Sequence, residues 1–399
     1  MPIPVLSSGS ASARSVFRPS APRRQRRFRS ERLARKRMNI ALMSLNTIED
    51  GADVSWLLST FCVCAAVPLL QYIQTSKEGK DSSTKEGKSK LKKIGRNKLA
   101  AIDWGGHDSE GPRDEMEDSW CMRNLNGKLL YFGIFDGHGG AASSTYLKSN
   151  LLDFIDQAGM KMCDQVVKGD TLKDYGVDEE NPLASAFERA DSALLDHLGS
   201  LGDPECWSGS TATVCFVSDN HVITANVGDS RAVLGRKGRT VDMSNDHRPV
   251  GSSKAGRAEI SRIIESGGWV SQMRVCGILA VSRAFGDYEF KGGRAELLQE
   301  FESTGASGIG TLERPPVVAL PDVRVYERSE EDDFLVIATD GLWDVMNSAQ
   351  AITFVRSMMK RDSTYKMHDV ASALVERAIK SRTQDNVSCI VVDLRSSQL

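Results

Sequence analysis

LLYFGIFDGHGG, residues 129–140, joins an apolar run to an acid, a histidine and three glycines. The apolar run 129–135 predicts a β-strand. Asp136 follows this strand directly, and the glycines let the backbone approach another group closely. His138 adds a group that titrates near neutral pH. An Asp-Gly pair alone is more often a turn, but the combination in this stretch indicates a functional site.

Other acids occupy the same kind of position, at the ends of predicted strands. Asp340 follows the run FLVIAT, Asp229 follows a strand in VGDSR, and Asp385 precedes the strand NVSCIVVDL. Glu117 and Asp118 lie in RDEMEDSW. Carboxylates are costly to gather in one place unless a cation neutralises them. Hard divalent cations with oxygen ligands, Mg²⁺ or Mn²⁺, are therefore the expected partners.

The pattern of a folded domain extends over residues 101–395. Apolar spacing predicts helices at 181–198, 349–359 and 368–379. Strands are predicted at 129–135, 210–217, 221–227, 231–234, 240–243, 334–339 and 387–394. Short turn signals between several of them, such as Lys237-Gly238, favour antiparallel pairing. Strands of this kind with helices between them indicate an α+β or layered architecture.

The composition is that of a chain with a substantial core. Of the 399 residues, 40% are hydrophobic and 26% are charged, which is ordinary for globular proteins. The net charge of −2 argues against a nucleic-acid partner for the whole protein. The eight cysteines form no CxxC pair. Thiols in a reducing compartment are therefore expected, and a zinc site is not.

The N-terminal segment 1–53 differs from the rest of the chain. Ten arginines fall within residues 1–38, where Glu31 is the only acid and serines are frequent. Arg-rich, Ser-rich and acid-poor composition is typical of an organelle transit peptide. A disordered tail and a basic arm that binds nucleic acid are the alternatives.

Residues 54–73 form an uncharged apolar segment, VSWLLSTFCVCAAVPLLQYI. Its length is the roughly 20 residues that a membrane helix needs, but its polar residues weaken that reading and Pro68 would kink a helix. A membrane anchor and the hydrophobic part of a presequence both fit. Residues 74–100 are rich in lysine, glycine and serine and read as a basic linker.

The chain resembles the metal-dependent protein phosphatases of type 2C across nearly all of residues 101–394. The resemblance lies in many blocks that occur in the family's order: RDEMEDSW, YFGIFDGHGG, SGSTATVCFV, ITANVGDSRAVL, DHRP, SGGWV, LAVSRAFGDYEFK, PDV, FLVIATDGLWDVM and TQDNVSCIVVDL. It implies a four-layer α/β/β/α sandwich, in which two packed antiparallel sheets are flanked by helices. It also implies a binuclear Mn²⁺ or Mg²⁺ centre between the sheets.

Carried over to this chain, the resemblance assigns metal-binding roles to acids already singled out. It implies that Asp136 bridges the two metals and that the Gly137 carbonyl binds the first. The remaining implied roles are Asp340 and Asp385 as ligands of the second metal, Glu117 and Asp118 as acids of the water-mediated shell, and Asp229 as an acid of a weaker third ion. Metals about 4 Å apart activate water and stabilise the charge of in-line attack.

Two further residues match the family's catalytic groups. Arg113 matches the arginine that binds the substrate phosphate, and its planar fork suits phosphate oxygens better than lysine does. His138 matches the proposed general acid, which protonates the departing seryl or threonyl oxygen. The function implied is hydrolysis of phosphoserine and phosphothreonine in phosphoproteins by a monomeric enzyme. A catalytically weak scaffold or a tethered adaptor is the alternative, but the metal acids are all present.

Several blocks, among them DHRPVGSS and SGGWV, look most like plant and algal members of the family, some of which are chloroplast enzymes. A chloroplast location is therefore expected, with association to a membrane through residues 54–73. The cytosol or nucleus, and a mitochondrion, remain alternatives. The segment 291–316 corresponds to the family's variable flap beside the active site. It contains no tryptophan, which disfavours the role of a plant hormone co-receptor.

Overall fold

The computed structural model describes residue 99 and residues 102–395, apart from gaps at 166–171, 176–180, 182, 202–203, 294–311 and 363. The predictions for segments 1–53, 54–73 and 74–100 lie outside these residues, apart from Leu99, and so does most of the predicted flap. The described residues belong to one compact unit, which spans 88–298 and 310–399.

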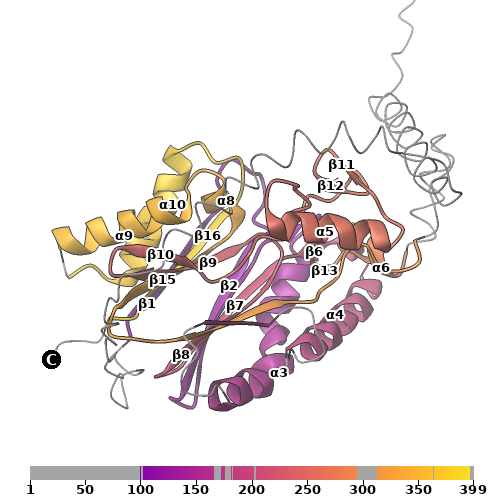
Figure 1. Cartoon of the computed structure of the whole chain (residues 1–399). Coiled ribbons are helices and arrows are strands. Elements are labelled where there is room, and N and C mark those ends of the chain that lie inside the picture. Colours follow the sequence, from indigo (N-terminus) through magenta and orange to yellow (C-terminus); the bar gives the residue numbers. More distant parts are fainter. Residues whose placement is uncertain are drawn as a thin grey trace, which may run out of the picture. The chain divides into compact units, whose positions relative to one another are not determined.

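Two antiparallel sheets form the centre of this unit (Figure 1). The larger sheet has six strands in the order β2 (Ser119–Leu125), β3 (Leu129–Phe135), β7 (Ala212–Val217), β8 (His221–Val227), β14 (Asp322–Glu327) and β5 (Leu172–Tyr175). The second has five, in the order β1 (Trp104–Ser109), β16 (Val387–Asp393), β15 (Asp332–Ala338), β9 (Arg231–Arg236) and β10 (Arg239–Asp242). Every neighbouring pair in both sheets is antiparallel.

The strand β3 shows why the sheets stack. Its residues are buried throughout, because side chains alternate between two covered faces. One face packs between the sheets and consists of Leu130, Phe132 and Ile134. The other packs under helices and includes Leu129, Tyr131 and Phe135. An apolar run without polar alternation is therefore what this central strand requires.

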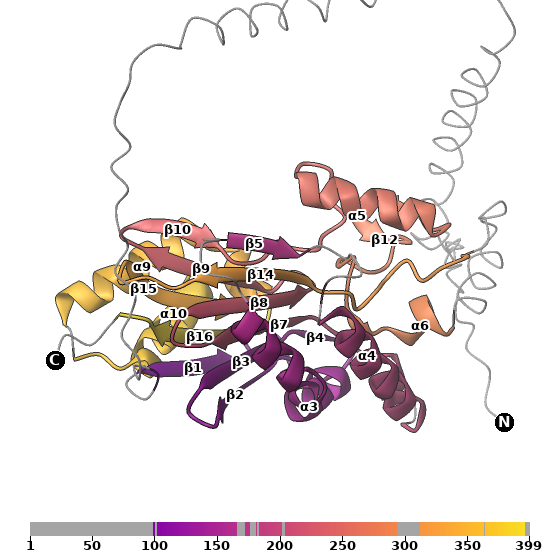
Figure 2. The ribbon, with the colours of Figure 1, turned by 60° about the horizontal axis from the view of Figure 1, so that its bottom comes forward.

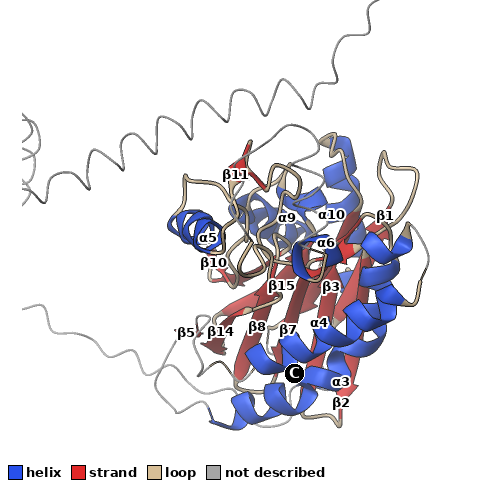
Figure 3. Cartoon of the chain, turned by 90° about the vertical axis from the view of Figure 1, so that its right-hand side faces the viewer, coloured by secondary structure: helices blue, strands red, loops and turns tan. Residues whose placement is uncertain are grey.

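Helices cover the outer faces of both sheets. The helices α3 (Ala142–Gln165) and α4 (Ala184–Gly199) lie side by side on the six-stranded sheet (Figure 3). The helices α9 (Ser348–Arg361) and α10 (Met367–Lys380) cover the five-stranded sheet. The predicted four-layer α/β/β/α sandwich is confirmed.

Smaller elements lie around one end of the sandwich (Figure 2). A three-stranded sheet joins β13 (Phe285–Gly286), β6 (Gly209–Ser210) and β4 (Gly137–His138). The remaining elements are the hairpin β11 (Val270–Ser271) and β12 (Arg274–Val275), and the helices α5 (Lys254–Glu265), α6 (Tyr288–Lys291), α8 (Asp340–Trp343) and η3 (Glu205–Trp207).

All the elements predicted from the sequence are present, with ends that differ by a few residues. The strand predicted at 210–217 begins later, because Gly209–Ser210 pairs separately with β4 and β13. The elements that were not predicted from the sequence include α3, α5, β1, β2 and β14. Among the described residues, no helix has the length and apolar character needed to cross a membrane.

Candidate metal centre and active site

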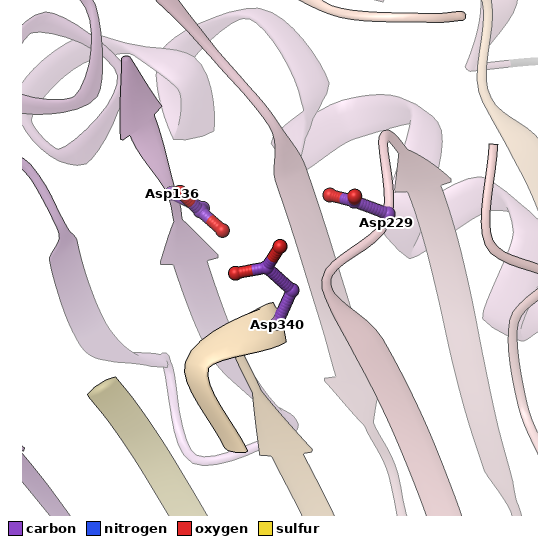
Figure 4. A group of neighbouring side chains, drawn as sticks. All are labelled: Asp136, Asp229 and Asp340. Atoms are coloured by element: carbon purple, nitrogen blue, oxygen red, sulfur yellow. The ribbon is translucent and has the colours of Figure 1, made fainter. Parts of the chain in front are cut away.

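Three aspartates from separate strand ends meet in one place. Asp136 lies between β3 and β4, Asp229 follows β8, and Asp340 is the first residue of α8 after β15. Each offers a carboxylate oxygen, and these oxygens all lie within 4.8 Å of one another. Figure 4 shows the three side chains facing a common space, with Asp340 between the other two. The structure therefore brings together three of the acids that were singled out at strand ends in the sequence.

The glycines after two of these aspartates allow the backbone to pack closely. A Cβ atom on Gly137 would lie 2.3 Å from the carbonyl oxygen of Glu117, and one on Gly341 would lie 1.9 Å from that of Asn386. Neither distance is compatible with a side chain, so both Asp-Gly pairs are close-approach sites rather than simple turns. These close contacts place the RDEMEDSW loop and the residue before β16 next to the aspartates.

The side chain of Asn386 organises the RDEMEDSW loop. Its Oδ1 accepts a hydrogen bond from the Glu117 backbone N–H (2.9 Å), and its Nδ2 donates to the carbonyl oxygens of Glu110 and Glu115 (2.9 Å each). Asn386 is buried. Asn386 lies in a motif that is visible in the sequence, but its role could not be predicted there. Its partners lie about 270 residues away along the chain.

Arg113 and Asp385 face each other at the cleft. An Arg113 terminal nitrogen donates to Asp385 Oδ2 (2.6 Å), and Nε donates to the carbonyl oxygen of Gln384 (2.9 Å). The side chains remain 49% and 37% exposed, so both are accessible from solvent. Two hydrogen bonds thus hold the guanidinium in position while it remains accessible from solvent.

Glu117 and Asp118, the two acids of RDEMEDSW with an expected metal role, have different surroundings. Glu117 lines the cleft and accepts a hydrogen bond from the Gly140 backbone N–H through Oε1. Asp118 is buried, and its Oδ2 accepts a hydrogen bond from the Thr339 hydroxyl (2.9 Å). Thr339 directly precedes Asp340, so Asp118 connects the start of β2 to the end of β15.

A cleft of about 480 Å³ contains these groups. Its walls come from both sheets, from the loop after β10 and from the β11–β12 hairpin. The lining residues are Arg113, Glu117, Asp136, Gly137, His138, Thr211, Asp229, Arg248, Val250, Gln272, Met273, Arg274, Leu279, Ala280, Val281, Asp340, Asp344 and Asp385. Eight of the nine residues singled out from the sequence are among them; the exception is Asp118.

The electrostatics of the cluster favour a bound cation. Burial, together with the charges of Asp340 and other acids nearby, raises the pKa of Asp136 well above its ordinary value. Burial and the neighbouring Asp229 charge raise the pKa of Asp340 to about 8, although Arg248 opposes this. Burial raises the pKa of Asp118 to about 7. Such carboxylates are stable in their ionised form only when positive charge lies among them.

The donor set fits hard divalent cations. All three clustered groups are carboxylates, and among the described residues that line the cleft there is no cysteine. Oxygen donors of this kind suit Mg²⁺ and Mn²⁺ rather than softer metals. The residues present therefore match the metal class expected from the sequence.

His138 pairs with Asp287, an acid that was not predicted from the sequence to belong to the site. Its Nε2 lies 3.0 and 3.1 Å from the two carboxylate oxygens of Asp287. Partial burial would lower the pKa of His138, but the charge of Asp287 and its hydrogen bond raise it. Asp287 has a left-handed backbone (φ 52°). A Cβ on Gly209 would lie 2.3 Å from His138 Nε2, so glycine makes room for this pair.

The comparisons with known proteins agree with this geometry. The family model described as Protein phosphatase 2C matches residues 102–387. The chain is 36% identical over 299 residues to Protein phosphatase 2C 57 of Arabidopsis thaliana, covering 73% of this chain and 75% of that protein. It is also 36% identical over 297 residues to Protein phosphatase 2C homolog 3 of Schizosaccharomyces pombe, covering 71% of this chain and 63% of the relative.

Solved structures share the fold. A crystal structure of a phosphatase from a pathogenic strain of Toxoplasma gondii superposes with a TM-score of 0.55 at 22% identity, over 75% of this chain and 96% of that one. The chain belongs to the protein phosphatase 2C family. It is a metal-dependent protein serine/threonine phosphatase, whose substrates are phosphoproteins.

Proposed function

We propose that the cleft binds two divalent cations, Mn²⁺ or Mg²⁺, and that the residues around them hydrolyse phosphoserine and phosphothreonine. The supporting observation is the cluster of Asp136, Asp229 and Asp340, whose oxygens lie within 4.8 Å of one another. Asp136, the Gly137 carbonyl and Asp340 would hold the ions. Asp385, Glu117, Asp118 and Asp229 complete the proposed set, with Asp229 serving a weaker third ion.

The bound metals would supply Lewis acidity and an activated water. The chain's own groups would orient the substrate. Arg113 is held by the Gln384 carbonyl (2.9 Å) and offers N–H donors at the open side of the cleft, where a phosphate enters. A phosphate that binds here would exchange places with Asp385 on the guanidinium.

His138 would protonate the leaving seryl or threonyl oxygen. The Asp287 carboxylate favours the protonated imidazole, which is the form that a general acid requires. The His138–Asp287 contact also fixes the orientation of the ring. The scaffold or adaptor alternative is less well supported, because a protein without turnover has no need for this acid cluster and histidine.

Substitution of the metal acids tests the proposal. We expect Asp136→Ala, Asp340→Asn and Asp385→Asn each to remove nearly all activity on a phosphothreonine peptide, and double variants to lose little more. Asp333→Asn is the matched control, since Asp333 lies on β15 and pairs with Arg356 outside the cleft. Folded Asp136→Ala protein that keeps full activity and wild-type Mn²⁺ binding in calorimetry would refute the site.

The subcellular location and the oligomeric state of the enzyme are further parts of the proposal. The composition of residues 1–53 and 54–73 supports delivery to a chloroplast and association with a membrane, with 74–100 as the linker to the catalytic domain at 101–395. We also propose that the enzyme acts as a monomer on phosphoproteins and not on nucleic acid. The net charge of −2 supports the last point.

A further inference from the structure

The guanidinium of Arg248 contacts three carboxylates at the edge of the acid cluster. Its Nε donates to Asp229 Oδ2 (2.6 Å), and one terminal nitrogen donates to Asp340 Oδ2 (2.8 Å). The other terminal nitrogen lies 3.0 Å from Asp344 Oδ1. Asp229 and Asp340 belong to the cluster that offers ligands to a metal. Arg248 therefore binds two of the carboxylates that a divalent cation would use on this side.

The backbone holds Arg248 in this place. The preceding residue, His247, donates its backbone N–H to the Gly228 carbonyl (2.9 Å), and the Gly228 N–H donates to His247 Nδ1 (3.1 Å). Gly228 directly precedes Asp229. On the other side, a Cβ on Gly256 would lie 2.0 Å from the Val250 carbonyl oxygen, so α5 packs tightly on this loop. The Arg248 side chain is 32% exposed and is built into the wall of the cleft.

Arginine suits this position better than lysine does. A guanidinium has five N–H donors in a planar fork, so its separate nitrogens can hold separate carboxylates. A lysine ammonium is a compact point charge and cannot match three acids spread around a plane. Two cations that share the same carboxylate oxygens also repel each other strongly at short distance. Binding of a metal ion to Asp229 and Asp340 must therefore oppose binding of Arg248 to the same two side chains.

We propose that Arg248 is an internal counter-ion that competes with a divalent cation for Asp229 and Asp340. It holds these acids in place when metal is scarce and weakens the last metal ion to bind. The proposal rests on the metal site proposed above.

Metal titration of Arg248→Gln tests the competition. Wild-type and variant protein are stripped of metal, and Mn²⁺ binding is measured by calorimetry and by the electron paramagnetic resonance signal of free Mn²⁺. We expect the weakest Mn²⁺ ion to bind at least about tenfold more tightly in the variant, since a positive charge has left its ligands. In EDTA the variant should melt at a lower temperature, and saturating Mn²⁺ should raise its melting temperature more than that of the wild type.

Arg231→Gln is the matched control. Arg231 also binds a carboxylate through two nitrogens, at Asp246 (2.9 and 2.5 Å), and its side chain is similarly exposed. It does not line the cleft. Loss of this pair should lower the melting temperature with and without metal, and should change the Mn²⁺ affinity much less than Arg248→Gln does, because Arg231 bonds to Asp246 and to none of the three clustered aspartates. A structural role alone would make Arg248→Gln behave in the same way.

The outcomes separate the two proposals. If wild-type protein binds no Mn²⁺, the metal site itself fails and the role of Arg248 fails with it. If the wild type binds Mn²⁺ and Arg248→Gln binds it with the same number and affinity, only the counter-ion role is overturned. If the variant does not fold, the wild-type ¹⁵N resonance of Arg248 Nε, assigned by its loss in Arg248→Lys, is followed during Mg²⁺ titration. The Arg248 Nε resonance should shift when the last Mg²⁺ ion binds, while the Arg231 Nε resonance stays in place. An Arg248 resonance that has not moved at Mg²⁺ saturation overturns the counter-ion role.

Discussion

Single residues decide the chemistry of this site through partners that lie far away in the sequence. His138 and Asp287 are 149 positions apart and form a direct pair, and Arg248 reaches Asp340 over 92 positions. The acids at strand ends could be predicted, because each follows or precedes an apolar run. The residues that support the site, Asp287 beside His138, Asn386 behind the RDEMEDSW loop and Arg248 beside the acids, could not be predicted. No local pattern marks a side chain whose role depends on a contact made only in the folded chain.

At His138, the leaving group should decide how much activity a substitution removes. A seryl oxygen needs a proton to depart, whereas an aryl oxygen needs little. We expect His138→Ala to lose at least about tenfold more kcat on a phosphothreonine peptide than on an aryl phosphate, a difference of ~1.4 kcal/mol in barrier. Steady-state kinetics on both substrates make the comparison. Equal losses would remove His138 from the general-acid role.

At Arg113, the shape of the cation should matter more than its charge. Arg113→Lys keeps the charge but loses the planar pair of donors. We expect kcat/KM on a phosphothreonine peptide to fall at least about tenfold, with Mn²⁺ binding unchanged by calorimetry. Arg123→Lys, on β2 and bonded through its side chain to the Met122 carbonyl, is the control. A lysine variant with wild-type kcat/KM would show that Arg113 does not position the phosphate.

At the scale of elements, an ion cluster fastens α5 to the sandwich. Glu259 on α5 accepts hydrogen bonds from Arg262 (2.9 Å) and from Arg283 (2.7 Å), and Arg283 also binds Asp322 (2.9 Å) at the start of β14. Glu259 and Arg283 are both buried. Burial alone would raise the pKa of Glu259, but the charge and hydrogen bond of Arg283 lower it to about 2.

This pairing should make stability depend on pH in a defined window. A carboxyl group with a lowered folded-state pKa stabilises the fold above its unfolded value and loses that contribution as pH falls. Glu259→Gln should be less stable than the wild type by about 3 kcal/mol at pH 7. This difference in the free energy of unfolding should narrow as the pH falls from about 4.5, the ordinary pKa of a glutamate, to about 2, the pKa of Glu259 in the folded protein. Urea unfolding at several pH values measures it, with Glu265→Gln as an exposed control. A gap that widens on acidification would contradict the assignment.

The elements themselves differ in how far sequence predicts them. The strands β3, β15 and β16 were found because they are buried on both faces and therefore read as apolar runs. By contrast, β2 has a single buried residue, Cys121, and it carries no such signal. The helix α3 begins with Ala-Ser-Ser-Thr. Serine and threonine are typical of turns and helix caps rather than of helix interiors. The start of α3 is therefore hard to recognise in the sequence, although the buried residues of the helix have helical spacing.

At the scale of the whole molecule, the sequence predicts a catalytic unit that follows a long N-terminal segment. The four-layer sandwich gathers the acids by stacking two sheets whose strand ends meet at one cleft. Desolvation of ten arginines within residues 1–38 would cost more than their few apolar neighbours return. The proposed role of that segment is therefore addressing and not catalysis.

A fusion of residues 1–100 to a fluorescent protein tests the address. We expect signal in plastids of a plant cell, and carbonate extraction of the processed enzyme to show whether residues 54–73 keep it on a membrane. A fusion of residues 101–399 serves as the control and should not enter the organelle. Uniform cytosolic or nuclear fluorescence of the 1–100 fusion would rule out targeting.

The most direct measurement of the central claim is hydrolysis of a phosphothreonine peptide by the purified protein, before and after removal of metal. Turnover should stop in EDTA, return when Mn²⁺ or Mg²⁺ is restored, and persist in okadaic acid. The circular dichroism spectrum in EDTA should remain that of a folded α+β protein. Full hydrolysis by enzyme shown to be free of metal would contradict the account.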